Sequence, residues 1–200
     1  MCRNGLFADT DAPLGAARIV GAPRTYLRLD TDKCPNQTDA CKGRAYLVPG
    51  DTVITAQTAG AYACVYFPNK SGGSAGYVRR DEYSPLPAQK DPALADWKGE
   101  WRDGDNRIRL WASGGKIGAA GNAYWPSRNP SPAEAPGGPH LGDFGGAAAP
   151  KGSSVEFHEG DAPSQCVVHL TLVEPFLIAR DNRQCGGMNV SFSGVYSKAK

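Results

Sequence analysis

Six cysteines constrain this 200-residue chain more than any other feature of its sequence. None belongs to a C-x-x-C pair, the spacing that is typical of zinc ribbons and thioredoxin-type sites. An even set without that spacing is typical of disulfides, which persist in an oxidising compartment. A nucleophilic cysteine would also need a histidine and an orienting partner, and the stretch "DNRQCGGMNVSFSGVY" around Cys185 supplies neither. We therefore expect a disulfide-stapled, exported scaffold.

Local sequence favours two of the many pairings that six cysteines allow. Cys34 and Cys41 enclose the polar stretch "PNQTDA", a spacing suited to a disulfide that staples a loop. Cys166 and Cys185 each begin an alternating pattern, "CVVHLTL" and "CGGMNVSF", so the two could meet where neighbouring strands start. We expect the bridges Cys34–Cys41 and Cys166–Cys185.

The remaining two cysteines leave two alternatives open. Cys64 in "YACVYF" lies on the opposite strand face from Val65. We expect it to point away from the core and to hold the N-terminal segment through a Cys2–Cys64 bridge. Alternatively, Cys2 carries a lipid anchor, as the first cysteine of a mature bacterial lipoprotein often does, and Cys64 is left unpaired. Such a lipid is the only membrane attachment that we expect.

The chain contains 25 glycines and 16 prolines, spread along its whole length. That distribution favours many short strands and turns over helices, so the fold class that we expect is all-β. A formal net charge of +2 gives no strong field toward nucleic acid, and we expect no nucleic-acid partner. No apolar run approaches a membrane span, and "MCRNGLFAD" lacks the apolar segment of a signal peptide, as expected for a mature exported form.

The chain divides at the stretch "SPLPAQKDPALAD", which is rich in proline and alanine and shows no strand periodicity. We expect an N-terminal extension over 1–17, a first domain over 18–85, a linker over 86–95 and a second domain over 96–200. Before the linker, segments such as "TYLRLD", "DTVITAQ" and "AYACVYF" are short β patterns separated by turns, which predicts a small barrel.

Three motifs of the first domain stand in a familiar order: "GDTV" at 50–53, "GAY" at 60–62 and "GYV" at 76–78. In this order they resemble the bacterial SH3-like domain, a binding and scaffold module rather than a catalyst. The sequence departs from that family at "YLRLDTDKCPNQTDACKGR", a region that contributes to ligand grooves in the family. The resemblance implies binding of peptidoglycan stem peptides.

Tyrosines are concentrated in the same domain. Because aromatic-lined grooves serve peptide recognition, the candidate binding residues here are Tyr62, Tyr66 and Tyr77. Arg79 and Arg80 would form the polar rim of that site. The alternative is that the tyrosines are core residues that close the barrel.

The second domain shows strong two-residue periodicity. Ile108 and Leu110 alternate with arginines in "NRIRLWA", and Met188, Val190 and Phe192 share one face of "MNVSFSGVYSK". About seven or eight antiparallel strands in this length predict a closed or nearly closed meander barrel. The opening W-x-G-x-W and closing F-x-G-x-Y motifs resemble the ends of small lipocalin-like barrels, including bacterial periplasmic lysozyme inhibitors. The whole arrangement resembles bacterial envelope proteins that join an SH3-like domain to such a barrel.

The sequence offers no assembled catalytic or metal-binding motif. Its three histidines show no H-x-H or H-x-x-x-H spacing, and there is no G-x-S-x-G elbow. "DGDN" at 103–106 resembles the start of a calcium loop but lacks the spacing of glycine and distal glutamate that such a loop needs, and it fits a hairpin turn. The acidic residues available to a glycosidase-type site are more typical of solvated strand positions: Glu100, Glu156, Glu159 and Glu174. We expect no enzyme, no metal and no cofactor.

The stretch "PSRNPSPAEAPGGP", 126–139, is a long connection with five prolines. Loops of this length in a compact domain are often functional, and proline lowers the entropy lost on docking. An inhibitor that plugs an enzyme cleft would use such a loop, and its candidate contact residues are Arg128, Asn129, Glu134 and His140. The alternative is a tolerated surface insertion.

Three functions compete at this point, and the third, an enzyme, lacks any assembled motif. The first is a non-catalytic periplasmic inhibitor or immunity-type protein that binds and blocks a cell-wall-degrading enzyme or toxin of the lysozyme or amidase type. The second is an envelope module that binds peptidoglycan or its peptides through the SH3-like domain. The disulfide-stapled β framework, the lysozyme-inhibitor-like barrel ends and the long loop favour the first.

Overall fold

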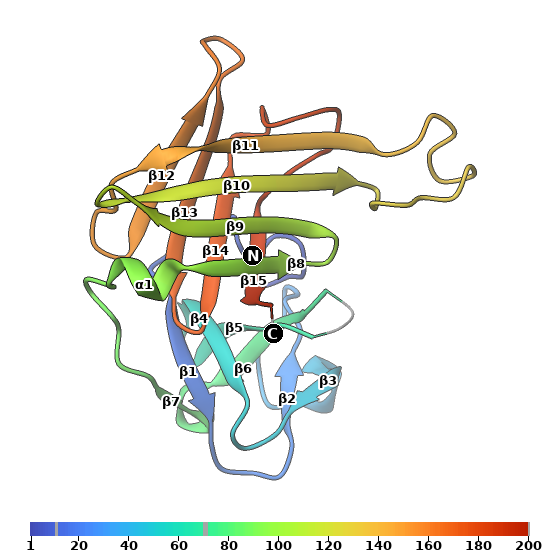
Figure 1. Ribbon diagram of the computed structural model, residues 1–200. Helices are drawn as coiled ribbons and strands as arrows, with labels where there is room; N and C mark the ends of the chain where they lie inside the picture. Colours follow the sequence, from blue (N-terminus) through green and yellow to red (C-terminus); the bar gives the residue numbers. More distant parts are fainter. Residues whose placement is uncertain (11, 70–71, 200) are drawn as a thin grey trace. The chain divides into compact units, whose positions relative to one another are not determined.

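A computed structural model describes residues 1–10, 12–69 and 72–199 of the chain (Figure 1). The chain forms two compact units, Met1–Ala88 (unit 1) and Gln89–Lys200 (unit 2). Their boundary falls inside the expected linker, although the last residues of that linker enter a short helix, α1 (Leu94–Trp97). In the described ranges, the only other helical turns are η1 (Asp39–Cys41) and η2 (Arg80–Glu82). The fold is therefore all-β, as the glycine and proline content predicted.

Unit 1 contains one antiparallel sheet of seven strands in the order β3-β2-β6-β5-β4-β1-β7. Its core is formed by aliphatic side chains that alternate with polar ones along these strands, as in β1, where Ala17 and Ile19 are buried and Arg18 is exposed. The first strand starts inside the expected extension 1–17. The strands are β1 (Gly15–Ile19), β2 (Thr25–Arg28), β3 (Lys42–Leu47), β4 (Thr52–Ala59), β5 (Tyr62–Phe67), β6 (Ser74–Arg79) and β7 (Tyr83–Pro85).

The N-terminal segment covers the second face of this sheet. Cys64 points away from the core as expected, but it is completely buried, because the Cys2–Cys64 disulfide holds residues 1–8 against β5. Phe7 in that segment packs against Tyr66, with ring centroids 5.2 Å apart. The sulfur of Cys2 is thus in a disulfide, and it is the atom that lipidation would need. The second disulfide of unit 1 is Cys34–Cys41.

Unit 2 contains one antiparallel sheet of eight strands in the order β11-β10-β9-β8-β15-β14-β13-β12, which nearly closes into a barrel (Figure 1). Two four-stranded meanders, β8-β9-β10-β11 and β12-β13-β14-β15, are joined by the pairing of β15 with β8, which leaves β11 and β12 as the edges. The barrel fold predicted from the alternating pattern is confirmed. The strands are β8 (Gly99–Asp103), β9 (Asn106–Ser113), β10 (Lys116–Trp125), β11 (His140–Ala148), β12 (Ser154–Glu159), β13 (Cys166–Val173), β14 (Phe176–Asp181) and β15 (Gly194–Lys198).

Aromatic side chains fill the barrel interior. Phe144 lies 5.8 Å from Phe157 and 4.8 Å from Phe192 between ring centroids, the second pair edge to face. A Cβ atom at Gly121 would overlap the ring of Phe144, so this glycine makes room for the aromatic cluster. Trp101 is also buried, and its indole N–H donates to the Trp97 carbonyl at 2.9 Å.

The last strand differs from the expectation. Met188, Val190 and Phe192 do not share the face of one strand: β15 begins only at Gly194, Met188 is 72% exposed, and Val190 and Phe192 are buried. The physical reason is a competing set of hydrogen bonds. The Asp181 carboxylate accepts the Phe192 N–H at 3.1 Å and two nearby serine hydroxyls, so a side chain binds this backbone instead of a neighbouring strand.

Candidate docking end of the barrel

The antiparallel order of the barrel brings alternate connections to the same end. One end collects the β8–β9 turn, the β10–β11 loop 126–139, the β12–β13 loop and residues 182–193 between β14 and β15. We call it the loop end. The β8–β9 connection is the hairpin turn that "DGDN" predicted. The residues predicted as docking contacts all lie at the loop end: Arg128, Asn129, Glu134 and His140.

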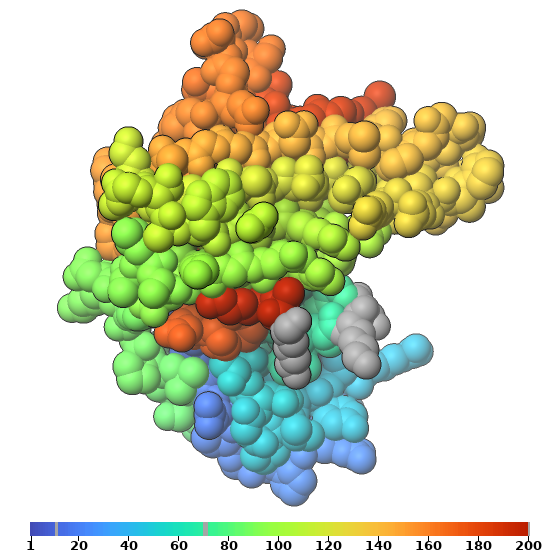
Figure 2. Space-filling view, in the orientation of Figure 1, coloured from blue at the N-terminus to red at the C-terminus, as the bar shows by residue number. Residues whose placement is uncertain are grey.

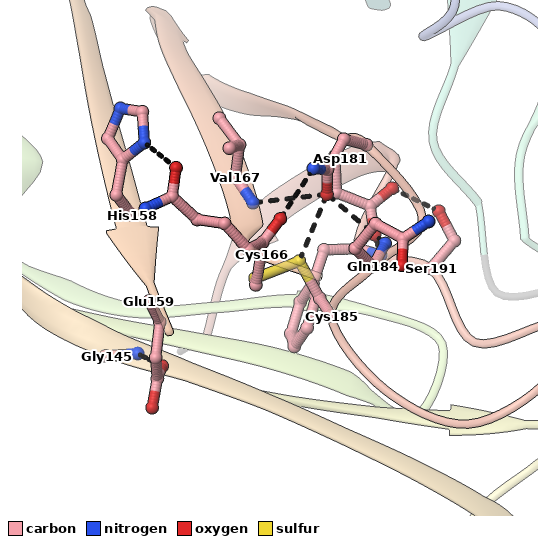
Figure 3. Close-up of a disulfide and its surroundings, with 12 residues drawn as sticks. Gly145, His158, Glu159, Cys166, Val167, Asp181, Gln184, Cys185 and Ser191 are labelled. Atoms are coloured by element: carbon pink, nitrogen blue, oxygen red, sulfur yellow. Dashed lines mark hydrogen bonds between the residues drawn. A yellow bond between two sulfur atoms is a disulfide. The ribbon is translucent and has the colours of Figure 1, made fainter. Parts of the chain in front are cut away.

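Near this end, a hydrogen bond and a disulfide stabilise the seam between the edge strands β11 and β12 (Figure 3). The Gly145 N–H donates to a Glu159 carboxylate oxygen at 2.6 Å, which links the two edges directly. The disulfide Cys166–Cys185 ties residues 182–190 to the start of β13. From there the chain reaches β11, where Gly186 forms a β-bridge with Gly142. Cys185 is therefore half of a structural disulfide that anchors residues 182–190 to β13.

Asn182 organises the same segment, and nothing in its sequence context singled it out. Its side-chain oxygen accepts the N–H groups of Val167 at 3.1 Å and Gln184 at 3.2 Å, and its side-chain amide donates to the Gln165 carbonyl at 2.8 Å. An asparagine that serves three backbone groups fixes a turn much as a strand neighbour would.

A buried polar cluster supports the loop end from inside. The Tyr196 hydroxyl donates to the Phe192 carbonyl at 2.9 Å, and the Asn106 amide donates to the Ser191 carbonyl at 3.0 Å. Burial raises the pKa of Asp103 to about 6, although a hydrogen bond from the Val195 N–H partly offsets this shift. Burial, and then the charge of Asp103, also raise the pKa of Tyr196. These contacts join β9, β15 and residues 191–193 into one hydrogen-bonded unit.

Loop 126–139 is ordered by its own hydrogen bonds. The Glu134 carboxylate accepts both the N–H of Ser131 at 3.0 Å and its hydroxyl at 2.8 Å, and these bonds lower the pKa of Glu134. At the base of the loop, the Arg128 N–H donates to Asp105 at 2.9 Å. Figures 1 and 2 show the loop, in yellow, standing out beyond the ends of its two strands.

Exposed apolar side chains lie at the base of this loop. Trp125 is 37%, Leu141 59% and Met188 72% exposed. The ring of His140 lies 5.3 Å from the Trp125 ring between centroids, and its Nδ1 hydrogen-bonds with the Met188 carbonyl at 2.5 Å. His140 thus contacts both the Trp125 ring and the backbone at Met188. We call Trp125, Leu141 and Met188 the apolar base. The sequence does not reveal it, because Met188 alternates with Val190 and Phe192 as a core residue of a strand would.

The predicted tyrosine groove of unit 1 does not match the structure. Tyr66 and Tyr77 are only 5% and 6% exposed, so their rings do not line an open groove. Tyr62 is half-buried and pairs across the strands with Arg79, whose guanidinium bonds Asp81. Arg80 is exposed. The physical reason is the disulfide-held N-terminal segment, which covers the face on which Tyr66 lies.

Three of the four glutamates considered for acid–base chemistry have structural partners. Glu100 bonds Arg102 at 2.6 Å, Glu156 bonds His158 at 2.8 Å, and Glu159 holds the barrel seam. Glu174 is exposed in the β13–β14 turn. Over the described ranges, no group of three His, Cys, Asp or Glu side chains could hold a metal ion.

Comparison with protein-family models, curated proteins and solved structures finds no match to this chain. In the part of the chain that the structure describes, no helix is long and apolar enough to cross a membrane. The three disulfides are consistent with an oxidising compartment, extracellular or periplasmic.

Proposed function

We propose that the protein is a non-catalytic periplasmic inhibitor or immunity-type protein that binds and blocks a cell-wall-degrading enzyme, with loop 126–139 as its docking element. One observation carries this proposal: the loop projects from the barrel, is ordered by its own hydrogen bonds and stands on an exposed apolar base.

The order of the loop matters because association must offset the entropy of every segment that becomes fixed. A loop that is already held by the Glu134–Ser131 bonds and by its prolines loses little further freedom on docking. The apolar base then supplies the kind of surface that becomes the buried centre of protein interfaces, where tryptophan and methionine are enriched.

The class of partner follows from charge and from the barrel ends. Glycosidases of the cell wall carry paired carboxylates in their clefts. Arg128 is an exposed cation in the loop, and its guanidinium suits bidentate pairing with a carboxylate. The resemblance of the barrel ends to lysozyme inhibitors supports the same class of enzyme. The engagement of Glu100, Glu156 and Glu159 in structural contacts favours binding over catalysis.

The test replaces Pro130–Gly137 by the dipeptide Asn-Gly and measures inhibition of a panel of lysozyme-type and amidase-type enzymes on peptidoglycan sacculi. We expect the intact protein to inhibit at least one enzyme, and the loop variant to need at least about a hundredfold more protein, because the deletion removes the projecting part of the interface and a hundredfold loss corresponds to about 3 kcal/mol. The tryptophan fluorescence of the folded barrel should be retained.

The matched control shortens another exposed connection at the same end, replacing Asp161–Ser164 of the β12–β13 loop in the same way. Equal inhibition by the intact protein and the Pro130–Gly137 variant would contradict the docking role of the loop. Sedimentation of the intact protein with sacculi, without inhibition of any enzyme, would favour the envelope-binding alternative instead.

A further inference from the structure

The outer face of β2 and β3 in unit 1 carries only cations and tyrosines. Along β2 the outward positions alternate with the core residue Leu27, and along β3 they alternate with small residues and Leu47. Arg24 directly precedes β2 and continues its outward row. The outward residues are Arg24, Tyr26 and Arg28 from β2 and Lys42, Arg44 and Tyr46 from β3.

Four of these side chains form an ordered stack. Tyr26 and Tyr46 are direct cross-strand partners with ring centroids 5.7 Å apart. The Lys42 ammonium lies 4.0 Å from the centroid of the Tyr26 ring, and the Arg24 guanidinium lies 4.8 Å from that of Tyr46. Cation–π contacts hold the two cations in place without neutralising their charge. We call these four residues the cation–tyrosine stack.

The charge of this face is not balanced locally. Within the described ranges, Arg24, Lys42 and Arg44 have no carboxylate within salt-bridge distance, whereas Arg3 pairs with Asp30 and Arg79 with Asp81. Tyr46 is 45% exposed, so the stack is open to solvent. The face thus offers several free N–H donors, already positioned, to an anionic partner.

The same strand is an edge of its sheet. β3 is the last strand in the order, so alternate backbone N–H and C=O groups point away from β2. In the described structure, no backbone group of Gly43–Leu47 is hydrogen-bonded outside the sheet. A groove of about 420 Å³ adjoins the strand on the positions between its cations. The groove is of mixed character: its apolar part is lined by Leu27, Leu29, Gly43 and Ala45, and its polar part includes Arg3, Asn4, Asp30 and Arg44.

We propose that the edge of β3 is a binding site for an extended acidic segment of a partner protein, which adds to the sheet as a further strand. The alternation of the segment would match that of β3. Carboxylates on one face would meet Lys42, Arg44 and the stack, and apolar side chains on the other would enter the groove. The proposal concerns unit 1 alone and does not rest on the inhibitor function.

The chemistry favours this occupant over two others. A second copy of the same edge would place cation opposite cation, which disfavours self-association. A polyanion such as nucleic acid would use the charge but neither the free backbone groups nor the apolar part of the groove. Only an acidic polypeptide strand uses all three.

The test measures binding of a fluorescein-labelled peptide of alternating Glu and Val to the full chain by fluorescence anisotropy. The controls are the neutral peptide of alternating Gln and Val, the block isomer with all Glu before all Val, and an oligo-dT of similar charge. We expect the alternating acidic peptide to bind at least about tenfold more tightly than each control, because only it places charges and apolar groups in register.

A charge variant locates the site. Lys42→Gln/Arg44→Gln, which removes two cations of β3 itself, should weaken binding of the acidic peptide about tenfold, since two cross-strand charge pairs are lost. Arg18→Gln, at an exposed position of β1 in the same unit, should leave it unchanged. Absence of peptide binding at millimolar concentration, equal binding of the block isomer, or equal or tighter binding of oligo-dT would each overturn the proposal. Equal loss on Arg18→Gln would overturn it as well.

Discussion

At the scale of single residues, Asp103 makes the stability of the barrel depend on pH. Asp103 is the last residue of β8, at the loop end. Its carboxylate packs so closely against Gly194 that a Cβ atom there would overlap Oδ2. Burial raises the pKa of Asp103 from 3.8 to about 6 in the folded state. The folded barrel therefore binds this proton more tightly than the unfolded chain does, and it loses stability as the pH rises from about 4 to about 6.

Asp103→Asn should remove that loss. We expect the free energy of unfolding of the intact barrel to fall by up to about 3 kcal/mol between pH 4 and pH 7 through this group, and the variant to lack this component. All four tryptophans of the chain lie in unit 2, so their fluorescence during urea unfolding reports on the barrel. The same pH dependence in both proteins would show that another group is responsible.

The burial of a side chain could be predicted from the sequence where it depends on local alternation, and not where it depends on distant segments. The buried positions Ile108 and Leu110 follow from alternation, which is a local property of the strand. The burial of Tyr66 is not local, because it depends on Phe7 and on a disulfide that spans 62 positions of the chain. The sequence around a tyrosine in a strand is the same whether the side chain is exposed to water or covered by another segment of the chain.

At the scale of elements, the irregular segment 182–193 links β13 and β14 to the edge strand β11, a role that a strand would have in a closed barrel. The side-chain oxygens of Asp181 and Asn182 accept the N–H groups of Phe192 and Gln184, and the Cys166–Cys185 disulfide fixes the start of the segment. The sequence pattern "MNVSF" is indistinguishable from a strand because it alternates. What decides the outcome is Asp181, whose carboxylate accepts the Phe192 N–H and the hydroxyls of Ser191 and Ser193.

Removing this disulfide should destabilise the barrel. The bridge closes a loop with a sequence separation of 19 residues. Loop-closure entropy predicts that Cys166→Ala/Cys185→Ala lowers the free energy of unfolding by about 3 kcal/mol. Urea unfolding followed by tryptophan fluorescence measures it.

The control for this variant is Cys34→Ala/Cys41→Ala, which removes the hairpin bridge of unit 1 and should leave the tryptophan-detected transition in place. An unchanged urea midpoint for the Cys166→Ala/Cys185→Ala protein would mean that the hydrogen bonds of Asp181 and Asn182 hold the segment without the bridge.

At the scale of the whole molecule, the sequence predicted the all-β class and the barrel, because strand periodicity and turn residues are local features of the sequence. It also identified loop 126–139 as long and proline-rich. It did not place Trp125, Leu141 and Met188 at the base of that loop, because Met188 arrives there through a turn after the Cys185 bridge. Likewise, the stack on β2 and β3 depends on the pairing of Tyr26 with Tyr46, which a bulged register hides from the sequence.

The central claim is that the protein acts by docking through loop 126–139. The most direct measurement introduces a photo-cross-linking amino acid at Asn129 or at Ala133, both exposed in the loop, with Trp111, 38% exposed on β9, as the control position. The account predicts that loop positions cross-link to a cell-wall hydrolase whose activity the protein inhibits, and that position 111 does not. Cross-linking to that enzyme from position 111 alone, or equally from all three positions, would contradict it.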